Sequence, residues 1–458
     1  MLDSAFKERM AKLLGDELSD FISAVEDGSA VKGARVNTGK ISTENFLNIT
    51  SLSLSPLSYL NEGYIINSCD GVGNTPEHHA GMIYVQDPGA MSTLSALDIR
   101  EGWWVLDSCA APGGKSTQAA AKIGNSGFIL SNEFVAKRAK TVVSNFERLG
   151  IKNGLVTSLD TAELPKMFRA IFDLVIADVP CSGEGMFRKS EDALEMWSEE
   201  NVLLCSRRQS EILENLAGLV KAGGYLLYST CTYSLEENEA VIDKFLEKHT
   251  DYKQIPVKNE LINVTRPGIS FEGATTSSLE LSRRFYPHIS AGEGQFIALL
   301  QRNDDIEDAR AILYKENVKQ PTREELTAVK NFFKENLKSE PCGRIIKYSD
   351  NLVLVSHDCP IPTHSVFSAG VLLGEVKKGL LFPSHQFFSS YGGLFKRQEN
   401  LTRGSSEIQK YLRGEEIDTS CGESGWCAVL YEGAALGGGK MSGGKIKNHY
   451  PKGLRTKG

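Results

Sequence analysis

The chain has 458 residues, of which 41% are hydrophobic and 24% charged, and its formal net charge is −7 at pH 7. This length predicts two to four domains, and the composition is that of a globular protein. The sequence has no apolar run near the ~18 residues of a membrane span, and its acidic start is not that of a secretory signal. We therefore expect a cytoplasmic enzyme, and the acidic balance alone does not predict a nucleic-acid partner.

Residues 1–68 predict a small N-terminal α/β module. A helical pattern runs from Phe6 to Val25 with its apolar residues on one face, and short segments follow around Val36, Phe46 and Leu60.

Residues 69–303 alternate predicted strands and helices, which is typical of a doubly wound, Rossmann-like α/β sheet. The predicted strands are residues 103–107, 127–133, 155–158, 172–178, 224–229 and 295–300. Four helices are predicted among these strands. One begins at Lys115, the second ends at Leu149, the third covers about 199–221, and the fourth runs from Glu236 to Lys248.

The remaining sequence predicts two further domains after an acidic boundary at residues 303–308. Residues 304–380 are predicted to form a connecting domain with a helix over about 321–337. Residues 381–458 are predicted to form a last domain of short strands and glycine turns. Residues 437–458 carry six Lys and Arg and no Asp or Glu. Because Trp426, Tyr450 and Leu454 accompany these charges, we favour an RNA-facing surface over a solvated tail.

Eight of the nine cysteines divide into two groups, and Cys109 lies in a glycine loop described below. The odd total argues against a disulfide framework and for a reducing compartment. They form no Cys-x-x-Cys pair and no Cys/His cluster at ligand spacing, so we predict no metal site. Free cysteine usually packs as a small hydrophobe, and this role is expected for Cys69, Cys205, Cys342, Cys359, Cys421 and Cys427.

Two other cysteines follow buried apolar runs and lie in polar turns. Cys181 is in Asp-Val-Pro-Cys-Ser-Gly (178–183), and Cys231 is in Ser-Thr-Cys-Thr (229–232). Ligands of open α/β sheets bind outside the carboxyl ends of the strands, so both thiols are expected to face one crevice. This arrangement suits covalent chemistry on cytosine, because a thiolate that adds to C6 allows C5 to accept a methyl group. The spacing alone does not decide which thiol attacks.

The segment 105–117 predicts a strand, a glycine turn and a helix start, where this fold binds a nucleotide-like ligand. A phosphate loop requires glycine where Cys109 stands, and Pro112 removes an amide. The dinucleotide pattern is absent because Gly113 and Gly114 are adjacent. With both phosphate-binding patterns excluded, we expect a cofactor that has no phosphates and that approaches the backbone closely. S-adenosylmethionine fits this description.

Acidic residues follow three successive predicted strands. Glu133 comes 20 residues after Gly113, near the spacing at which a carboxylate binds a ribose. Asp160 is placed to accept from an adenine amino group, and Asp178 precedes Cys181. Each alone is typical of a loop carboxylate or helix cap, but three together favour a site.

These motifs together resemble the Sun/nucleolar-protein family of RNA cytosine-5 methyltransferases between about Ala80 and Leu300. The C-terminal part is similar to the RsmF-like bacterial branch, which modifies small-subunit ribosomal RNA and ends in a PUA-like RNA-binding module. The core motifs are Tyr84-Val-Gln-Asp-Pro-Gly-Ala-Met, Leu106-Asp-Ser-Cys-Ala-Ala-Pro-Gly-Gly-Lys-Ser, Asn132-Glu-Phe-Val-Ala-Lys-Arg, Asp178-Val-Pro-Cys-Ser-Gly-Glu-Gly-Met-Phe-Arg-Lys, Tyr228-Ser-Thr-Cys-Thr-Tyr-Ser and Arg284-Phe-Tyr-Pro-His. The C-terminal motifs include Gly370-Val-Leu-Leu-Gly-Glu, Tyr411-Leu-Arg-Gly-Glu and Lys447-Asn-His-Tyr-Pro-Lys-Gly-Leu-Arg.

The resemblance implies S-adenosylmethionine-dependent methylation of cytosine C5 in RNA, with 16S ribosomal RNA or the 30S subunit as partner. It implies that Cys231 is the nucleophile, that Cys181 assists product release, and that Asp178 borders both cofactor and base. A transfer-RNA methyltransferase and a non-catalytic ribosome-assembly factor are the alternatives. The implied cofactor-binding residues are Cys109, Ala110, Ala111, Pro112, Gly113, Gly114, Lys115, Glu133, Arg138, Asp160 and Asp178.

Overall fold

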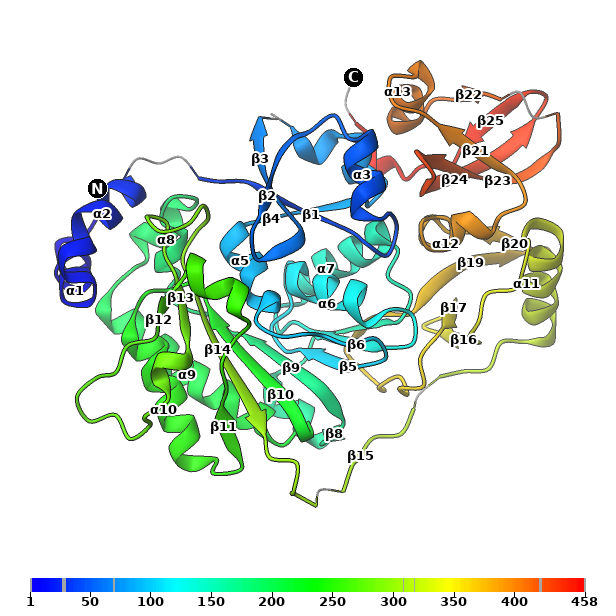
Figure 1. Cartoon of the computed structure of the whole chain (residues 1–458). Helices are drawn as coiled ribbons and strands as arrows, with labels where there is room; N and C mark the ends of the chain where they lie inside the picture. Colours follow the sequence, from blue (N-terminus) through cyan, green and yellow to red (C-terminus); the bar gives the residue numbers. More distant parts are fainter. Residues whose placement is uncertain are drawn as a thin grey trace.

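The computed structural model describes residues 2–26, 30–68, 71–307, 309–316, 318–419 and 422–456. Cys69 and Cys421, both expected to pack in a core, lie outside the described residues. A large central sheet carries helices on both faces, and smaller sheets lie beside it (Figure 1). Within the described ranges, every helix is too short or too polar to cross a membrane.

The N-terminal helical segment is interrupted. Two helices, α1 (Ser4–Leu14) and α2 (Leu18–Glu26), replace the single predicted pattern, because Gly15 adopts φ +54° and ends α1. An antiparallel sheet follows in the order β2-β3-β1-β4. Because β4 pairs with β1, the predicted boundary at residue 68 falls inside this sheet. Its elements and the nearby short helices are β1 (Gly33–Val36), α3 (Thr43–Ile49), β2 (Ser53–Leu57), β3 (Leu60–Ser68), α4 (Pro76–His79), β4 (Ile83–Gln86) and α5 (Pro88–Ser92).

The central sheet contains five neighbouring parallel strands in the order β10-β9-β5-β6-β7. The chain moves outward from β5 to β6 and β7, then returns to β9 and β10, so the order reverses between β5 and β9. A ligand crevice is expected at the carboxyl ends beside this reversal. The parallel strands are β5 (Trp104–Asp107), β6 (Phe128–Asn132), β7 (Gly154–Thr157), β9 (Phe172–Asp178) and β10 (Val220–Thr230). The remaining strands of the sheet are β11 (Tyr252–Gln254), β12 (Arg266–Pro267), β13 (Arg283–Phe285), β14 (Gln295–Arg302) and β18 (Val366–Ala369).

Helices cover both faces of this sheet because alternate strand residues point to opposite sides. Val105 packs in one cluster with α6 (Gly114–Ile123) and α7 (Ala136–Leu149). Leu106 packs in the other with α9 (Glu199–Ala217) and α10 (Glu239–Lys248). The predicted Rossmann-like α/β core is thus confirmed. The helix predicted over 199–221 ends earlier, at Ala217, because β10 already begins at Val220.

The predicted connecting domain is not separate from the core. β18 pairs with the edge strand β7, and β15 (Ala311–Ile312) pairs with β8 (Phe168–Arg169). The helix predicted near 321–337 is α11 (Arg323–Asn336), whose start is fixed by a Thr322–Glu325 capping box. A second sheet, β16-β17-β19-β20, crosses the predicted boundary at 380/381. Its strands are β16 (Arg344–Tyr348), β17 (Asn351–Val355), β19 (Val371–Lys377) and β20 (Leu380–Pro383).

The C-terminal segment is folded. Tyr450 is only 2% exposed, and its hydroxyl lies 2.7 Å from His79 Nδ1 of the N-terminal module. The expectation that Tyr450 faces RNA is therefore wrong, because its ring packs inward. The last sheet has the order β21-β23-β24-β25-β22. The elements of this region are α12 (His385–Tyr391), β21 (Gln398–Leu401), α13 (Ser406–Arg413), β22 (Ile417–Asp418), β23 (Gly425–Tyr431), β24 (Ala434–Ser442) and β25 (Lys445–Asn448).

Lys40 joins the N-terminal module, the core and the last sheet. Its Nζ donates to the carbonyls of Ala80 (2.8 Å), Arg148 (3.0 Å) and Ala435 (2.8 Å). Burial lowers the pKa of this amine to about 7. The three carbonyls accept hydrogen bonds from this partly buried amine, which therefore links the three modules.

Candidate active site

The two predicted thiols meet at the carboxyl ends of adjacent strands. β9 and β10 run parallel with Asp178 opposite Ser229, so the turns that follow them leave the sheet side by side. The sulfur atoms of Cys181 and Cys231 lie 3.2 Å apart. This hydrogen bond and burial raise the pKa of Cys181 well above its ordinary value. The two thiols are therefore close enough to reach the same small ring.

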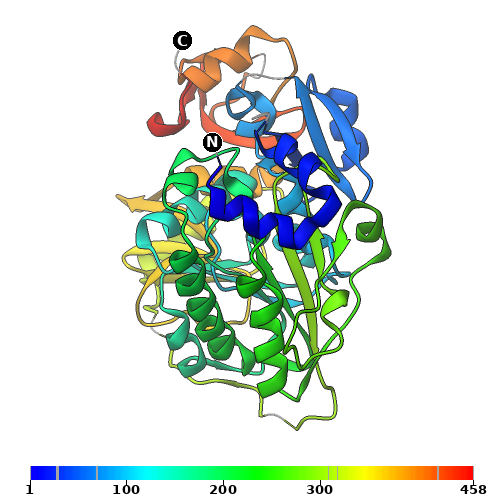
Figure 2. The ribbon, with the colours of Figure 1, turned by 90° about the vertical axis from the view of Figure 1, so that its left-hand side faces the viewer.

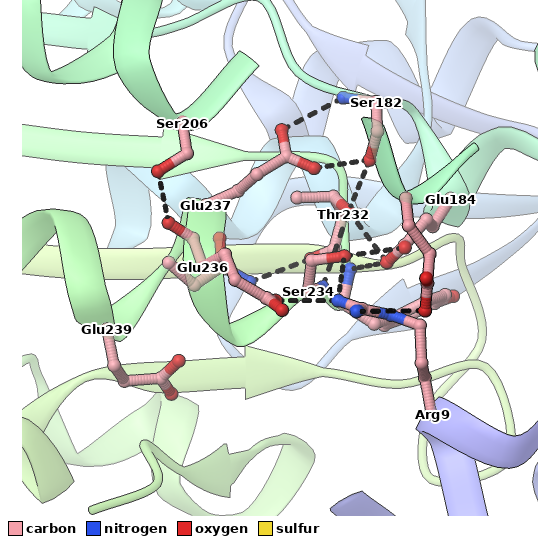
Figure 3. Close-up of polar contacts among 12 residues, drawn as sticks. Arg9, Ser182, Glu184, Ser206, Thr232, Ser234, Glu236, Glu237 and Glu239 are labelled. Atoms are coloured by element: carbon pink, nitrogen blue, oxygen red, sulfur yellow. Dashed lines mark hydrogen bonds and ion pairs between the residues drawn. The ribbon is translucent and has the colours of Figure 1, made fainter. Parts of the chain in front are cut away.

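Two buried carboxylates hold the cysteine turns together, each reaching from one turn to the other (Figure 3). Glu184, in the Cys181 turn, accepts hydrogen bonds from Thr232 Oγ1 (2.7 Å) and Ser234 Oγ (2.6 Å). Glu237, beyond Cys231, accepts from the Ser182 amide (3.0 Å) and from its hydroxyl. This reciprocal pairing fixes the relative position of the thiols.

Helix α9 and β10 support the second carboxylate. Gln209 Nε2 donates to Glu237 Oε2 (2.7 Å) and to the Pro180 carbonyl (3.0 Å). The Tyr228 hydroxyl donates to the Glu237 carbonyl (2.5 Å). Burial raises the pKa of Glu237 to about 7. These contacts tie the cysteine turns to the rigid sheet.

Asp178 connects the thiol crevice to the loop that follows β5. Lys115 Nζ donates to its Oδ2 (2.7 Å), and Ser229 Oγ donates to its Oδ1 (2.6 Å). Lys115 lies in the first turn of α6, after Gly113 at φ +107°. The positive φ explains the glycine, since other residues rarely adopt it. Asp178 thus lies between the glycine loop and the strand that leads to Cys231.

Glu133 and Arg138 converge on the same loop. Glu133 follows β6, is 2% exposed, and accepts from the amides of Ala111 (3.3 Å) and Val135 (3.0 Å). Arg138 Nη1 lies 3.5 Å from its carboxylate, and Nη2 donates to the Ala111 carbonyl (3.1 Å). Asp160 is different: this exposed residue caps a helical turn through the Ala162 amide (2.9 Å). Among the described residues, it forms no hydrogen bond or ion pair with the other predicted site residues.

The structure adds supporting residues that the sequence did not indicate. Arg35, buried on β1, donates to the Gly114 carbonyl (3.2 Å) and Thr117 Oγ1 (2.8 Å) at the start of α6. Arg9 on α1 donates to Glu236 (2.6 Å) beside the thiol turns, where α1 and α2 lie across the core (Figures 2 and 3). The sequence offered a signal for the first of these residues, since Arg35 stands between two apolar residues in Ala34-Arg35-Val36 and an arginine in such a position is rarely buried without a partner.

Three family models match consecutive parts of the chain. They are the N-terminal domain of 16S rRNA methyltransferase RsmF over residues 2–88, 16S rRNA methyltransferase RsmB/F over 94–301, and the methyltransferase RsmF PUA domain over 398–456. Ribosomal RNA small subunit methyltransferase F of Vibrio vulnificus is 30% identical, with 99% of this chain and 97% of that protein covered. The chain belongs to the RsmF family of 16S ribosomal RNA methyltransferases.

Solved structures agree with this assignment. A methyltransferase homologue from Pyrococcus horikoshii is 28% identical with a TM-score of 0.57, covering 66% of this chain and 95% of that chain. NSun6 from Pyrococcus horikoshii, solved with SFG, has a TM-score of 0.56 at 21% identity, covering 66% and 99%. The predicted resemblance is confirmed, as are the α/β core, the N-terminal module and the C-terminal PUA-like region. The RsmF family methylates RNA with S-adenosylmethionine as the methyl donor.

The residues of the crevice fit this donor, which carries a positive sulfonium and a positive ammonium group. Asp107 ends β5 as a buried carboxylate, and its Oδ1 has no hydrogen-bond partner among the described residues. Burial raises the pKa of Asp107 to about 7. Asp178 and Glu133 add two further carboxylates around the loop, but Lys115 and Arg138 already lie beside them. Within the described ranges, the unpartnered Oδ1 of Asp107 therefore remains as an acceptor for a cationic ligand.

On the sequence-based prediction that Glu133 accepts hydrogen bonds from the ribose, Glu133→Ala should weaken binding of S-adenosylmethionine by about 1.5–3 kcal/mol, or roughly 10- to 150-fold. Isothermal titration calorimetry measures this directly. Glu163→Ala is the matched control, because Glu163 is a partly exposed carboxylate paired with Lys166. Equal affinity of Glu133→Ala and the wild type would remove Glu133 from the cofactor site.

Proposed function

We propose that this RsmF-family enzyme methylates C5 of cytosine in small-subunit ribosomal RNA through a covalent adduct between Cys231 and C6. The 3.2 Å approach of the Cys181 and Cys231 sulfur atoms is the observation that carries the proposal. Methylation at C5 requires both addition of a nucleophile and its later elimination. Two thiols at one ring supply a group for each step, whereas a binding module has no use for them.

In the proposed reaction the Cys231 thiolate adds to C6 of a cytosine taken out of its stack. The addition moves the π electron pair of the C5–C6 bond onto C5, so that C5 can take the methyl group of S-adenosylmethionine. The methyl–sulfur bond breaks in this transfer, and S-adenosylhomocysteine leaves with its electron pair. The C5 proton then passes to solvent water, which restores the C5–C6 double bond and expels the Cys231 thiolate. Cys181, held beside Cys231 by the Glu184 and Glu237 contacts, assists this elimination. Asp178 borders the base in this proposal. Asp178 also borders the donor, together with residues 109–115, Glu133, Arg138 and Asp160.

The PUA domain and the N-terminal module are proposed to hold the surrounding RNA, either as free 16S ribosomal RNA or within the 30S subunit. We also propose that the enzyme works in the cytoplasm. The seven cysteines in the described part of the chain are free thiols, which supports a reducing compartment.

Bisulfite sequencing of ribosomal and transfer RNA from a deletion strain tests this function. We expect at least one 5-methylcytosine in 16S ribosomal RNA to disappear and to return with the wild-type gene but not with a Cys231→Ala gene. Loss of a site in transfer RNA would support the transfer-RNA alternative instead. Unchanged maps of both RNA classes would support a non-catalytic factor.

A further inference from the structure

Exposed aromatic side chains lie where the sheet containing β20 meets the PUA sheet. Phe382 on β20 is 42% exposed, and it points outward because its neighbour Leu381 is buried. The Phe382 ring meets the partly exposed Trp426 ring of β23 edge to face, with centroids 6.1 Å apart. Phe382 lies outside the segment matched by the PUA model, while Trp426 lies within it. The aromatic pair therefore joins β20 to β23 of the last sheet. The strand β20 contacts α11, beside which it lies in Figure 1.

Cationic side chains surround this pair. Lys440 Nζ lies 5.9 Å from the centroid of the Trp426 ring, and Lys447 is the partner of Lys440 across β24 and β25. The His449 ring is 5.0 Å from Trp426. Burial, together with the positive charges of Lys447 and Lys440, lowers the pKa of His449.

The charge at this surface is unbalanced. Both lysines are exposed and form no ion pair within the described ranges. Glu375, opposite Phe382 across β19 and β20, is already paired with Lys377 (2.5 Å). Phosphate groups are the anions that such lysines accept in an RNA-binding protein.

Exposed rings beside unpaired lysines fit one kind of partner. A base stacks on an aromatic face whatever its sequence, and lysines hold the phosphates on either side. An apolar protein surface would leave both lysines without a counter-charge. Bases of a duplex already stack on one another, so only an unpaired nucleotide can use the rings.

We propose that Phe382 and Trp426 form a stacking platform for an unpaired base of the RNA substrate, with Lys440 and Lys447 holding the adjacent phosphates. This platform extends the RNA-binding surface beyond the PUA domain onto β20. It rests on RNA as the partner, and it is independent of which base and which atom the enzyme methylates.

Fluorescence anisotropy with a fluorescein-labelled 12-nucleotide oligouridine tests the platform in the full chain. Stacking contributes about 1–3 kcal/mol per base, so Phe382→Leu should weaken binding about 5- to 150-fold. Phe382→Tyr keeps the ring and should bind like the wild type. Leu380→Ala removes an exposed apolar side chain from the same strand and should leave the affinity unchanged. A 12-base-pair RNA duplex should bind wild type and Phe382→Leu equally.

The lysines are tested by the salt dependence of oligouridine binding. Lys440→Ala/Lys447→Ala should lower the slope of log affinity against log salt by about 0.7 for each phosphate that the variant no longer neutralises. Lys244→Ala/Lys253→Ala is the control, because these exposed lysines lie on α10 and β11 in the core. Thermal melting verifies that each variant folds.

Equal oligouridine affinity of Phe382→Leu and the wild type would overturn the inference, as would equal weakening for oligouridine and duplex. An unchanged salt slope in the lysine variant would also contradict it. None of these results bears on the methylated atom, which the bisulfite map decides separately.

Discussion

Cys231→Ala should lower the rate of methyl transfer by about 10⁴-fold or more, because removing a covalent nucleophile eliminates the reaction path rather than slowing one step. The rate is measured as transfer of labelled methyl groups from S-adenosylmethionine to small-subunit ribosomal RNA. Binding of the donor should be retained, since the glycine loop and Glu133, which are proposed to hold it, follow β5 and β6, whereas Cys231 follows β10.

Cys342→Ala is the matched control for this result. Cys342, which was expected to pack as a small hydrophobe, is an exposed free thiol away from Cys181 and Cys231, so its removal should leave the rate within about twofold of the wild type. Substantial transfer by a folded Cys231→Ala enzyme would mean that another group attacks the base.

Glu184→Ala should lower the free energy of unfolding by about 3–5 kcal/mol, because it leaves several buried donors without an acceptor. The carboxylate accepts from Thr232 Oγ1 (2.7 Å), the Tyr233 amide (2.8 Å), Ser234 Oγ (2.6 Å) and Trp197 Nε1 (2.9 Å). Methyl transfer should fall as well, since one of the two carboxylates that connect the cysteine turns is removed. Urea unfolding gives the stability, and methyl-transfer assays on the folded fraction give the rate.

Glu195→Ala serves as the comparison, because Glu195 is an exposed carboxylate on the neighbouring helix α8 (Glu191–Glu195). This substitution should change the unfolding free energy by less than about 0.5 kcal/mol. If Glu184→Ala were equally harmless, the crossed carboxylates would not be what positions the thiols.

Much of the core was predictable because its signals are local. Short aliphatic runs ending in polar turns indicated the parallel strands, and the rule for carboxyl ends placed Cys181 and Cys231 at one edge. The structure brings those two sulfur atoms to 3.2 Å. Gly113 before α6 was likewise predictable, since the turn requires its backbone conformation.

Other features depend on contacts between distant segments, which no local pattern reports. In the sequence, Glu184 and Glu237 resemble ordinary polar loop residues. Only the structure shows that Glu184 accepts a hydrogen bond from Thr232 of the Cys231 turn and Glu237 one from Ser182 of the Cys181 turn. The short strand β18 joins the core sheet across more than 200 residues of sequence, so the boundaries between modules were not visible. Tyr450 occurs among lysines, and only its contact with His79 shows that it faces inward.

The most direct test of the proposed chemistry is mass spectrometry of Cys181→Ala after incubation with small-subunit ribosomal RNA and S-adenosylmethionine. Addition and methylation should proceed while elimination stalls, so a denaturing gel should show protein attached to RNA. Digestion should then yield a peptide in which Cys231 is bonded to a methylated cytosine. An adduct that forms in Cys231→Ala through Cys181, or none in Cys181→Ala, would contradict the assignment of the two thiols.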